Sequence, residues 1–375
     1  MASRIYFDNA ATTSIDPVVL DAMMPFLTNH FGNPSSIYSY GRETRNAIEK
    51  SRKSVSEILS AHPSEIFFTS GGTESSNTAI NAAIRDLGCT RIITSKVEHH
   101  ATLHTCVFLS HKYNIPIEYV ELLPDGHIDL IDLEKKLAGS TKKTLISLMH
   151  ANNEIGNITD IDQVGQLAKK HHAVFHADTV QTVGHFPINL HTTQVDFITG
   201  SAHKFHGPKG VGILYINSST QIPPLIHGGG QERNMRAGTE NIYGIVGFAK
   251  ALELATANHQ TDSTYIASIK SYLQDSLIEK ISGVTFNGDQ AGNALYTVLN
   301  VGFPKNEKSE MLLLNLDVNN ICVSGGSACS SGADQGSHVI QAIGNNEKMN
   351  VRFSFSKLNT KEEVDVLMNL LIDLV

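Results

Sequence analysis

The chain has 375 residues, a formal net charge of −8 and a hydrophobic content of 41%. This length suits one large domain with a smaller one, and the acidic balance argues against a general nucleic-acid binder, which needs a basic face. No apolar run reaches membrane-spanning length and the first residues lack a signal-peptide core, so we expect a cytoplasmic protein that does not enter the membrane. The four cysteines are too few and too scattered for a disulfide scaffold or a CxxC metal site.

Through the first 250 residues, short apolar runs of strand length alternate with helical patterns. The expected helices are 44–60, 73–87, 100–113 and 161–172, and the expected strands are 66–69, 91–95, 117–122, 144–149, 173–178, 195–200 and 212–216. This alternation predicts an α/β fold, in which a mostly parallel sheet is flanked by helices and ligands gather at the carboxyl ends of the strands.

The pattern changes near residue 250. The expected elements there are helices 243–258 and 264–281, strands 294–301 and 350–355, a helix from Ser309, and a last helix opened by a T-x-x-E capping box at Thr360 and Glu363. These elements are typical of a smaller α+β domain. We therefore predict a large domain over 15–255 and a small domain formed by 1–14 and 256–375.

Lys204 lies between the apolar segments 195–200 and 210–216, in the stretch SAHKFHGPKG. A solvated loop lysine is one interpretation, but a lysine held between buried strands loses water and becomes a usable amine nucleophile. Asp178 ends the strand 173–178, where an isolated carboxylate is costly unless it serves a turn. Together the two residues form the pair that a pyridoxal-phosphate enzyme needs: the lysine makes the Schiff base, and the acid keeps the pyridine nitrogen protonated.

A second motif, FFTSGGTESSNTAI (67–80), reads as a strand, a glycine pair and a helix that begins at Thr73 or Glu74. Backbone N–H groups at such a helix start bind anions, and Gly71 and Gly72 permit close approach of a phosphate. An ordinary capped βα turn would look similar. The motif is not a Walker loop, because the GK[ST] ending is missing.

Three histidines, His99, His100 and His104, follow the strand 91–95. The i, i+4 spacing of His100 and His104 could suggest a metal, but no third ligand accompanies them and we expect none. His99 just precedes the helix, where its imidazole could stack on a cofactor ring and shuttle protons. Asn153, after the strand 144–149, is either a neutral donor or a turn residue.

Cys329 lies in a run of Ser, Gly and Ala within 322–340, a composition that cannot pack a core and that predicts a mobile loop. We interpret the other three cysteines, Cys89, Cys106 and Cys322, as packing residues. Cys329 is then either an incidental thiol or one whose sulfur must travel.

In order and spacing, these motifs resemble the cysteine desulfurases of the class V aminotransferase family, which are fold type I pyridoxal-phosphate enzymes. The resemblance runs almost end to end through YFDNAATT, GNPSS, TSGGTESSN, EHHA, MHANNEIG, HADTVQTVG, SAHKFHGPKGVG, HGGGQERNMRAGTEN and SGGSACSSG. The long loop that carries Cys329 is similar to that of the iron–sulfur-cluster and nitrogen-fixation subgroup.

The resemblance implies a role for each motif residue. Lys204 would bind pyridoxal phosphate, Asp178 would pair with its pyridine nitrogen, and His99 would stack on its ring. The remaining implied contacts are Gln181 and Asn153 on the ring-oxygen side, Gly72, Thr73, Ser201 and His203 around the phosphate, and Thr239 reaching the phosphate of a neighbouring subunit. A homodimer follows from the last contact.

The implied reaction converts L-cysteine to L-alanine. Arg352, together with Asn153, would bind the substrate, Arg352 by clamping its carboxylate. Cys329 would take the sulfur as a persulfide and pass it to an acceptor protein, an iron–sulfur scaffold or a tRNA-thiolation protein. A selenocysteine lyase, another class V aminotransferase or a non-catalytic sulfur relay are the alternatives.

Overall fold

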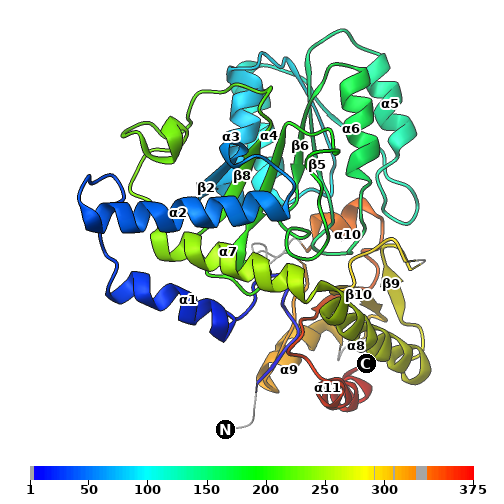
Figure 1. Ribbon diagram of the computed structural model, residues 1–375. Coiled ribbons are helices and arrows are strands. Elements are labelled where there is room, and N and C mark those ends of the chain that lie inside the picture. The colour runs from blue at the N-terminus through cyan, green and yellow to red at the C-terminus, as the bar shows by residue number, and fades with distance from the viewer. Residues whose placement is uncertain (1–3, 291, 307–308, 327–335) are drawn as a thin grey trace.

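The computed structural model describes residues 4–290, 292–306, 309–326 and 336–375. Its largest element is a seven-stranded sheet with the order β2-β8-β7-β6-β5-β3-β4 (Figure 1). The strands are β2 (Ile66–Thr69), β3 (Arg91–Thr94), β4 (Ile117–Tyr119), β5 (Thr144–Met149), β6 (Val174–Asp178), β7 (Phe197–Ser201) and β8 (Gly212–Ile216). β8 is antiparallel to β2 and β7, and the other neighbours are parallel. The predicted α/β fold with a mostly parallel sheet is therefore confirmed.

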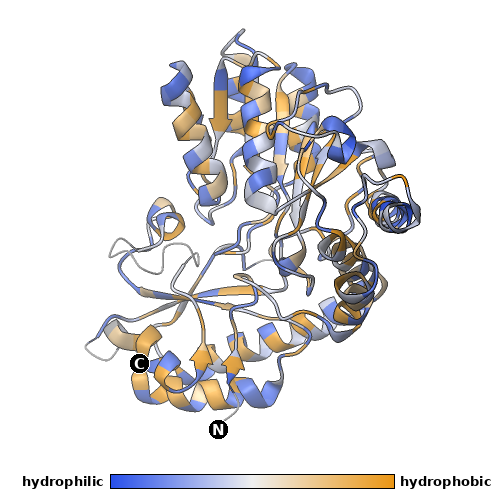
Figure 2. Ribbon diagram, turned by 90° about the vertical axis from the view of Figure 1, so that its left-hand side faces the viewer, coloured by the Kyte–Doolittle hydropathy of each residue, from blue (hydrophilic) through white to orange (hydrophobic). Residues whose placement is uncertain are grey.

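Side chains of each strand alternate between two hydrophobic clusters, because successive residues of a strand point to opposite faces. In β2, Phe67 packs in the cluster on the side of α3 (Gly72–Arg85) and α4 (His100–Tyr113), whereas Ile66 and Phe68 belong to the larger cluster on the other side. The larger cluster includes residues of α1 (Pro17–Thr28), α2 (Ser39–Ile58), α5 (Leu130–Ala138), α6 (Ile161–Lys170) and α7 (Ile242–Ala257). Figure 2 shows the hydrophobic strands enclosed between helices that also carry hydrophilic residues.

A further hydrophobic cluster joins both ends of the chain. β10 (Val298–Phe303) pairs antiparallel with β9 (Thr285–Asn287) and β12 (Met349–Ser354), and β1 (Ile5–Tyr6) pairs parallel with β11 (Ile321–Cys322). The helices that pack here are α8 (His259–Lys280), α9 (Leu312–Val318) and α11 (Lys361–Leu374) (Figure 1). The predicted capping box of α11 is present at Thr360 and Glu363. The domain boundaries at 14 and 255 stay a prediction.

The short helices lie at turns. They are η1 (Pro63–Glu65), η2 (Ala202–Lys204), η3 (Gln231–Asn234), η4 (Ser309–Met311) and α10 (His338–Ala342). α10 contributes Val339 and Ile340 to the larger cluster of the main sheet. Among the described residues, no helix is both long enough and apolar enough to cross a membrane.

Candidate active site

A cavity of about 220 Å³ lies where the carboxyl ends of several strands meet the N-terminal segment and β12. Ten of the predicted site residues line it: Gly72, Thr73, His99, Asn153, Asp178, Gln181, Ser201, His203, Lys204 and Arg352. They come from strand ends, turns and a helix start that are far apart in the sequence, and Arg352 comes from β12. The sheet gathers these turns because parallel strands end at one edge.

Lys204 occupies the last position of η2, between β7 and β8. Its Nζ lies 2.6 Å from the carbonyl oxygen of Ala10 and 2.9 Å from that of Ala11, so the side chain turns into the protein rather than out to solvent. Gln181 Nε2 donates to the same Ala10 carbonyl at 3.1 Å. No local sequence pattern predicts these two carbonyl partners.

Asp178 ends β6 and is 7% exposed. Its Oδ1 accepts hydrogen bonds from the Val180 N–H at 3.0 Å and from the Thr199 hydroxyl at 3.3 Å. The residue therefore serves the turn, as one interpretation held, and also presents its carboxylate to the cavity.

His99 is the N-cap of α4, and its Nδ1 accepts the Ala101 N–H at 3.1 Å. Burial lowers the pKa of His99, which favours a neutral ring whose proton is on Nε2. His203, whose Nδ1 lies 3.1 Å from Thr12 Oγ1, has its pKa lowered to about 4, chiefly by burial. Both imidazoles thus reach the cavity as neutral groups at pH 7.

The first turn of α3 forms one end of the cavity. Gly71, the residue before the helix, has φ of 152°, and a Cβ on Gly72 would lie 2.5 Å from Val180 Cγ2. The helix start is therefore built for a residue without a side chain. Its N–H groups lie at the positive end of a 14-residue helix, where an anion is favoured, and Thr73 and Ser201 line the same cavity.

Arg352 lies on β12 and is 1% exposed. Its Nη1 donates to the Asn153 carbonyl at 2.9 Å, and its Nη2 donates to Asp8 Oδ1 at 2.7 Å. Its buried Nε finds no hydrogen-bond partner among the residues that the structure describes. Asp8 was not among the predicted site residues, because its partner lies almost at the other end of the chain.

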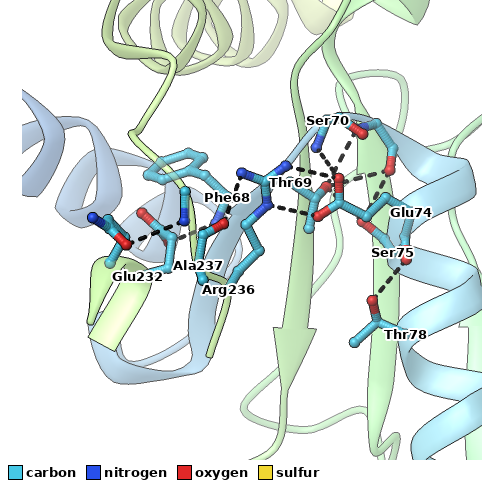
Figure 3. Close-up of polar contacts among 12 residues, drawn as sticks. Phe68, Thr69, Ser70, Glu74, Ser75, Thr78, Glu232, Arg236 and Ala237 are labelled. Carbon is cyan, nitrogen blue, oxygen red and sulfur yellow. Dashed lines mark hydrogen bonds and ion pairs between the residues drawn. The ribbon is translucent and has the colours of Figure 1, made fainter. Parts of the chain in front are cut away.

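Thr239 does not line this cavity; it lies on a separate hollow with Arg236 and Glu232. The segment before it is fixed to α3, since Arg236 Nε and Nη2 donate to the two carboxylate oxygens of Glu74 at 2.9 and 3.1 Å (Figure 3). Glu74 Oε2 also accepts the Ser70 N–H at 3.0 Å. Within one chain, then, Thr239 stays apart from the other predicted cofactor contacts.

Cys329 lies outside the described residues. Of the cysteines interpreted as packing residues, Cys89 and Cys106 are buried, and burial raises the pKa of Cys89 to about 12. Cys322 in β11 is only partly buried.

Glu98 was not among the predicted site residues. It is fully buried beside His99, and its Oε1 accepts the Met149 N–H at 2.9 Å. Burial raises the pKa of this carboxyl well above its usual range.

The ring of His100 lies against those of His104 and His338, with centroids 4.8 and 4.5 Å apart. Within the described part of the chain, no group of three or more His, Cys, Asp or Glu residues could hold a metal ion.

Known proteins resemble this chain over nearly its whole length. A family model described as aminotransferase class-V matches residues 5–367. The "Cysteine desulfurase IscS" of Dictyoglomus turgidum is 45% identical over 376 residues, which cover 99% of this chain and 94% of that protein. A solved structure named "NifS-like protein" superposes with a TM-score of 0.90 at 37% identity and covers 99% of both chains. "SspA in complex with cysteine" superposes with a TM-score of 0.80 at 33% identity, covering 96% of this chain and all of that one.

Proposed function

The chain belongs to the cysteine desulfurases of the class-V aminotransferase family, which use pyridoxal phosphate, and we propose below which of its residues bind the cofactor and the substrate. The observation that carries the proposal is the convergence of ten predicted residues on one cavity around Lys204. We propose that this cavity holds both pyridoxal phosphate and the substrate L-cysteine.

The residues present fit the cofactor. The start of α3, where a Cβ on Gly72 would meet Val180, suits a phosphate, with Thr73, Ser201 and His203 beside it. Asp178 offers a carboxylate for a pyridinium nitrogen, and Lys204 offers an amine. When bound, pyridoxal phosphate supplies an electron-withdrawing ring that stabilises negative charge at the α-carbon of an amino acid.

Each side chain then has a defined task. Lys204 Nζ would bind the cofactor, and its amine would move the α-proton of the substrate. The neutral His99 ring packs on the cofactor and can donate through Nε2, because Nδ1 is occupied by the helix cap. Gln181 and Asn153 offer amide donors at the ring-oxygen side.

Arg352 would bind the carboxylate of L-cysteine. Its buried Nε lacks a partner among the described residues, and a carboxylate would satisfy that donor in a charge-assisted hydrogen bond. The solved relative SspA was captured with cysteine, which supports this choice of ligand. Arg352 is only 1% exposed, and a guanidinium buried without partners would be costly. Asp8 and the Asn153 carbonyl accept hydrogen bonds from its two terminal nitrogens.

The sulfur step and the assembly stay proposals from the sequence. Cys329 would accept the sulfur of L-cysteine as a persulfide, leaving L-alanine, and would hand the sulfur to an acceptor protein such as an iron–sulfur scaffold. Thr239, held apart from the cavity of its own chain, would complete the phosphate site of a second copy in a homodimer.

The test is to incubate the cofactor-loaded protein with L-cysteine and to measure alanine, sulfide and protein persulfide together. We expect equal amounts of alanine and released or bound sulfur, and no alanine from Cys329→Ser. Cys322→Ser, a cysteine outside the cavity, is the matched control and should retain activity. Full alanine production by Cys329→Ser would overturn the assignment of the nucleophile.

A further inference from the structure

His185 connects the backbone of Lys204 to the segment between β9 and β10. Its Nε2 lies 3.0 Å from the Lys204 carbonyl oxygen, and its Nδ1 lies 3.1 Å from the Tyr296 hydroxyl. The imidazole thus touches Lys204 from outside the cavity, and it is not among the residues that line that cavity.

These contacts determine the tautomer of the ring. A carbonyl oxygen only accepts hydrogen bonds, so Nε2 of His185 carries the proton. Burial lowers the pKa of His185 to about 4, so the ring is neutral at pH 7 and Nδ1 is an acceptor. The Tyr296 hydroxyl lies 3.1 Å from Nδ1 and 3.3 Å from the carbonyl oxygen of His185, so its single proton is shared between these two acceptors. The same carbonyl also accepts from His259 Nε2 at 2.9 Å.

The side-chain donor at the carbonyl of Lys204 comes from outside its own turn. The next backbone donors, the N–H groups of Phe205 and Gly207, both bond to the Ala202 carbonyl. A small cavity of about 40 Å³, lined by Lys204, His185 and Tyr296 among others, borders this peptide. Packing on that side is therefore incomplete, which leaves the hydrogen bond from His185 a larger share in orienting the peptide group.

We propose that His185 is a positioning residue for the reaction: its Nε2–H holds the Lys204 peptide so that Nζ stays directed into the active cavity. Tyr296 acts one step further out, because a proton that its hydroxyl donates to Nδ1 favours the tautomer that makes this bond. The inference rests on the proposed role of Lys204 as the cofactor-binding lysine.

Two substitutions at one position separate positioning from mere filling of space. His185→Gln keeps an N–H donor near the place of Nε2, whereas His185→Leu keeps bulk and loses the donor. For the leucine variant we expect kcat to fall about tenfold with KM for L-cysteine within about twofold, since the loss affects Lys204 and not substrate binding. His185→Gln should recover most of this loss, and Tyr296→Phe should fall between the two.

His259→Leu is the matched control, because His259 joins the same ring cluster but bonds to the backbone of His185 and does not touch Lys204. It should change kcat by less than about twofold. A readout independent of turnover is the ring tautomer in cofactor-free protein labelled with ¹⁵N-histidine. The signal that disappears in His185→Gln should show an Nε2-protonated neutral ring, and Tyr296→Phe should perturb it.

The outcomes are distinguishable. If wild-type protein neither takes up pyridoxal phosphate nor forms alanine, the proposed function itself fails. If wild type is active but His185→Leu and His185→Gln lose kcat equally, or His185→Leu loses stability alone, the positioning role is wrong. An Nδ1-protonated ring would contradict it equally.

Discussion

Arg352 and Asp8 form an ion pair beside the cavity, with Nη2 2.7 Å from Oδ1, although 344 positions of sequence separate them. The pair is possible because the N-terminal segment lies against β12, where Ser354 forms a bridge with Asp8. Asp8 and the Asn153 carbonyl hold the two terminal nitrogens of the guanidinium. These two contacts fix the orientation of Arg352, which would reduce the ordering cost of the carboxylate binding that we propose for it.

Replacing Arg352 by lysine should raise KM for L-cysteine. A lysine keeps the positive charge but not the planar fork that binds a carboxylate and Asp8 together. We expect kcat/KM to fall about 10²-fold, measured by steady-state alanine production. Arg91→Lys is the control. Arg91 forms a similar ion pair, with its Nε 2.7 Å from Glu118 Oε1, and it does not line this cavity. An Arg352→Lys enzyme with unchanged KM would contradict the clamp.

Adding a methyl group at Gly72 should weaken cofactor binding for a steric reason that can be reversed. The new Cβ would lie 2.5 Å from Val180 Cγ2, with the next nearest atom at 3.8 Å. We expect the Kd for pyridoxal phosphate, measured by absorbance titration, to rise at least about tenfold in Gly72→Ala. The double variant Gly72→Ala, Val180→Ala should recover much of the affinity. Equal affinity of Gly72→Ala and wild type would show that the helix start does not hold the phosphate.

His99→Asn tests whether the ring matters beyond the helix cap. Asparagine is a good N-cap, so it can replace the acceptor that His99 Nδ1 offers to the Ala101 N–H, and stability should change by no more than about 1 kcal/mol. The imidazole is lost, however, and we expect kcat to fall about 10²-fold. Thermal unfolding and turnover of the same preparation provide the two readouts. A variant that keeps full turnover would leave His99 with a capping role alone.

Stability should decrease as the pH falls from about 6.5 toward 4. Burial is the main cause that lowers the pKa to about 4 for five histidines: His100, His150, His176, His185 and His203. Histidine has a pKa of about 6.5 in the unfolded chain. Below that pH the unfolded chain binds more protons than the folded chain, so protonation favours unfolding. The raised pKa of Glu98 acts in the opposite direction.

Urea unfolding at about pH 7.5 and about pH 5 measures this difference. His176→Gln should make the pH dependence shallower, because His176 is fully buried with Nδ1 2.8 Å from Ser147 Oγ. A free energy of unfolding that is equal or greater at the lower pH would contradict the assignment of neutral buried histidines.

Local patterns predicted much of this architecture because most of its strands are short buried apolar runs between helical segments. β5 and β6 lie almost where their sequences indicated. α1 was not predicted: Val19 and Met23 are buried while Val18, Leu20, Met24 and Leu27 are exposed, so its apolar residues do not follow one helical face. The helices predicted at 44–60 and 264–281 begin five residues earlier, at Ser39 and His259, because polar first turns carry no hydrophobic periodicity.

The site was predictable in its residue types and less so in its contacts. Lys204, Asp178 and His99 each follow or precede a strand or helix whose ends could be read locally. Their partners could not be found in this way, because the contacts of Ala10, Asp8 and His185 depend on how distant segments pack. Ala10 contacts Lys204 through its own backbone carbonyl, and His185 contacts the backbone carbonyl of Lys204.

Borohydride reduction of the protein loaded with pyridoxal phosphate, followed by peptide mapping by mass spectrometry, measures whether Lys204 carries the cofactor in this cavity. Reduction makes the lysine–cofactor bond permanent, and we predict a single pyridoxyl-modified peptide with the label on Lys204 and none in Lys204→Ala. A label on another lysine such as Lys209, or no label in a protein that still forms alanine, would show that Lys204 is not the cofactor-binding lysine.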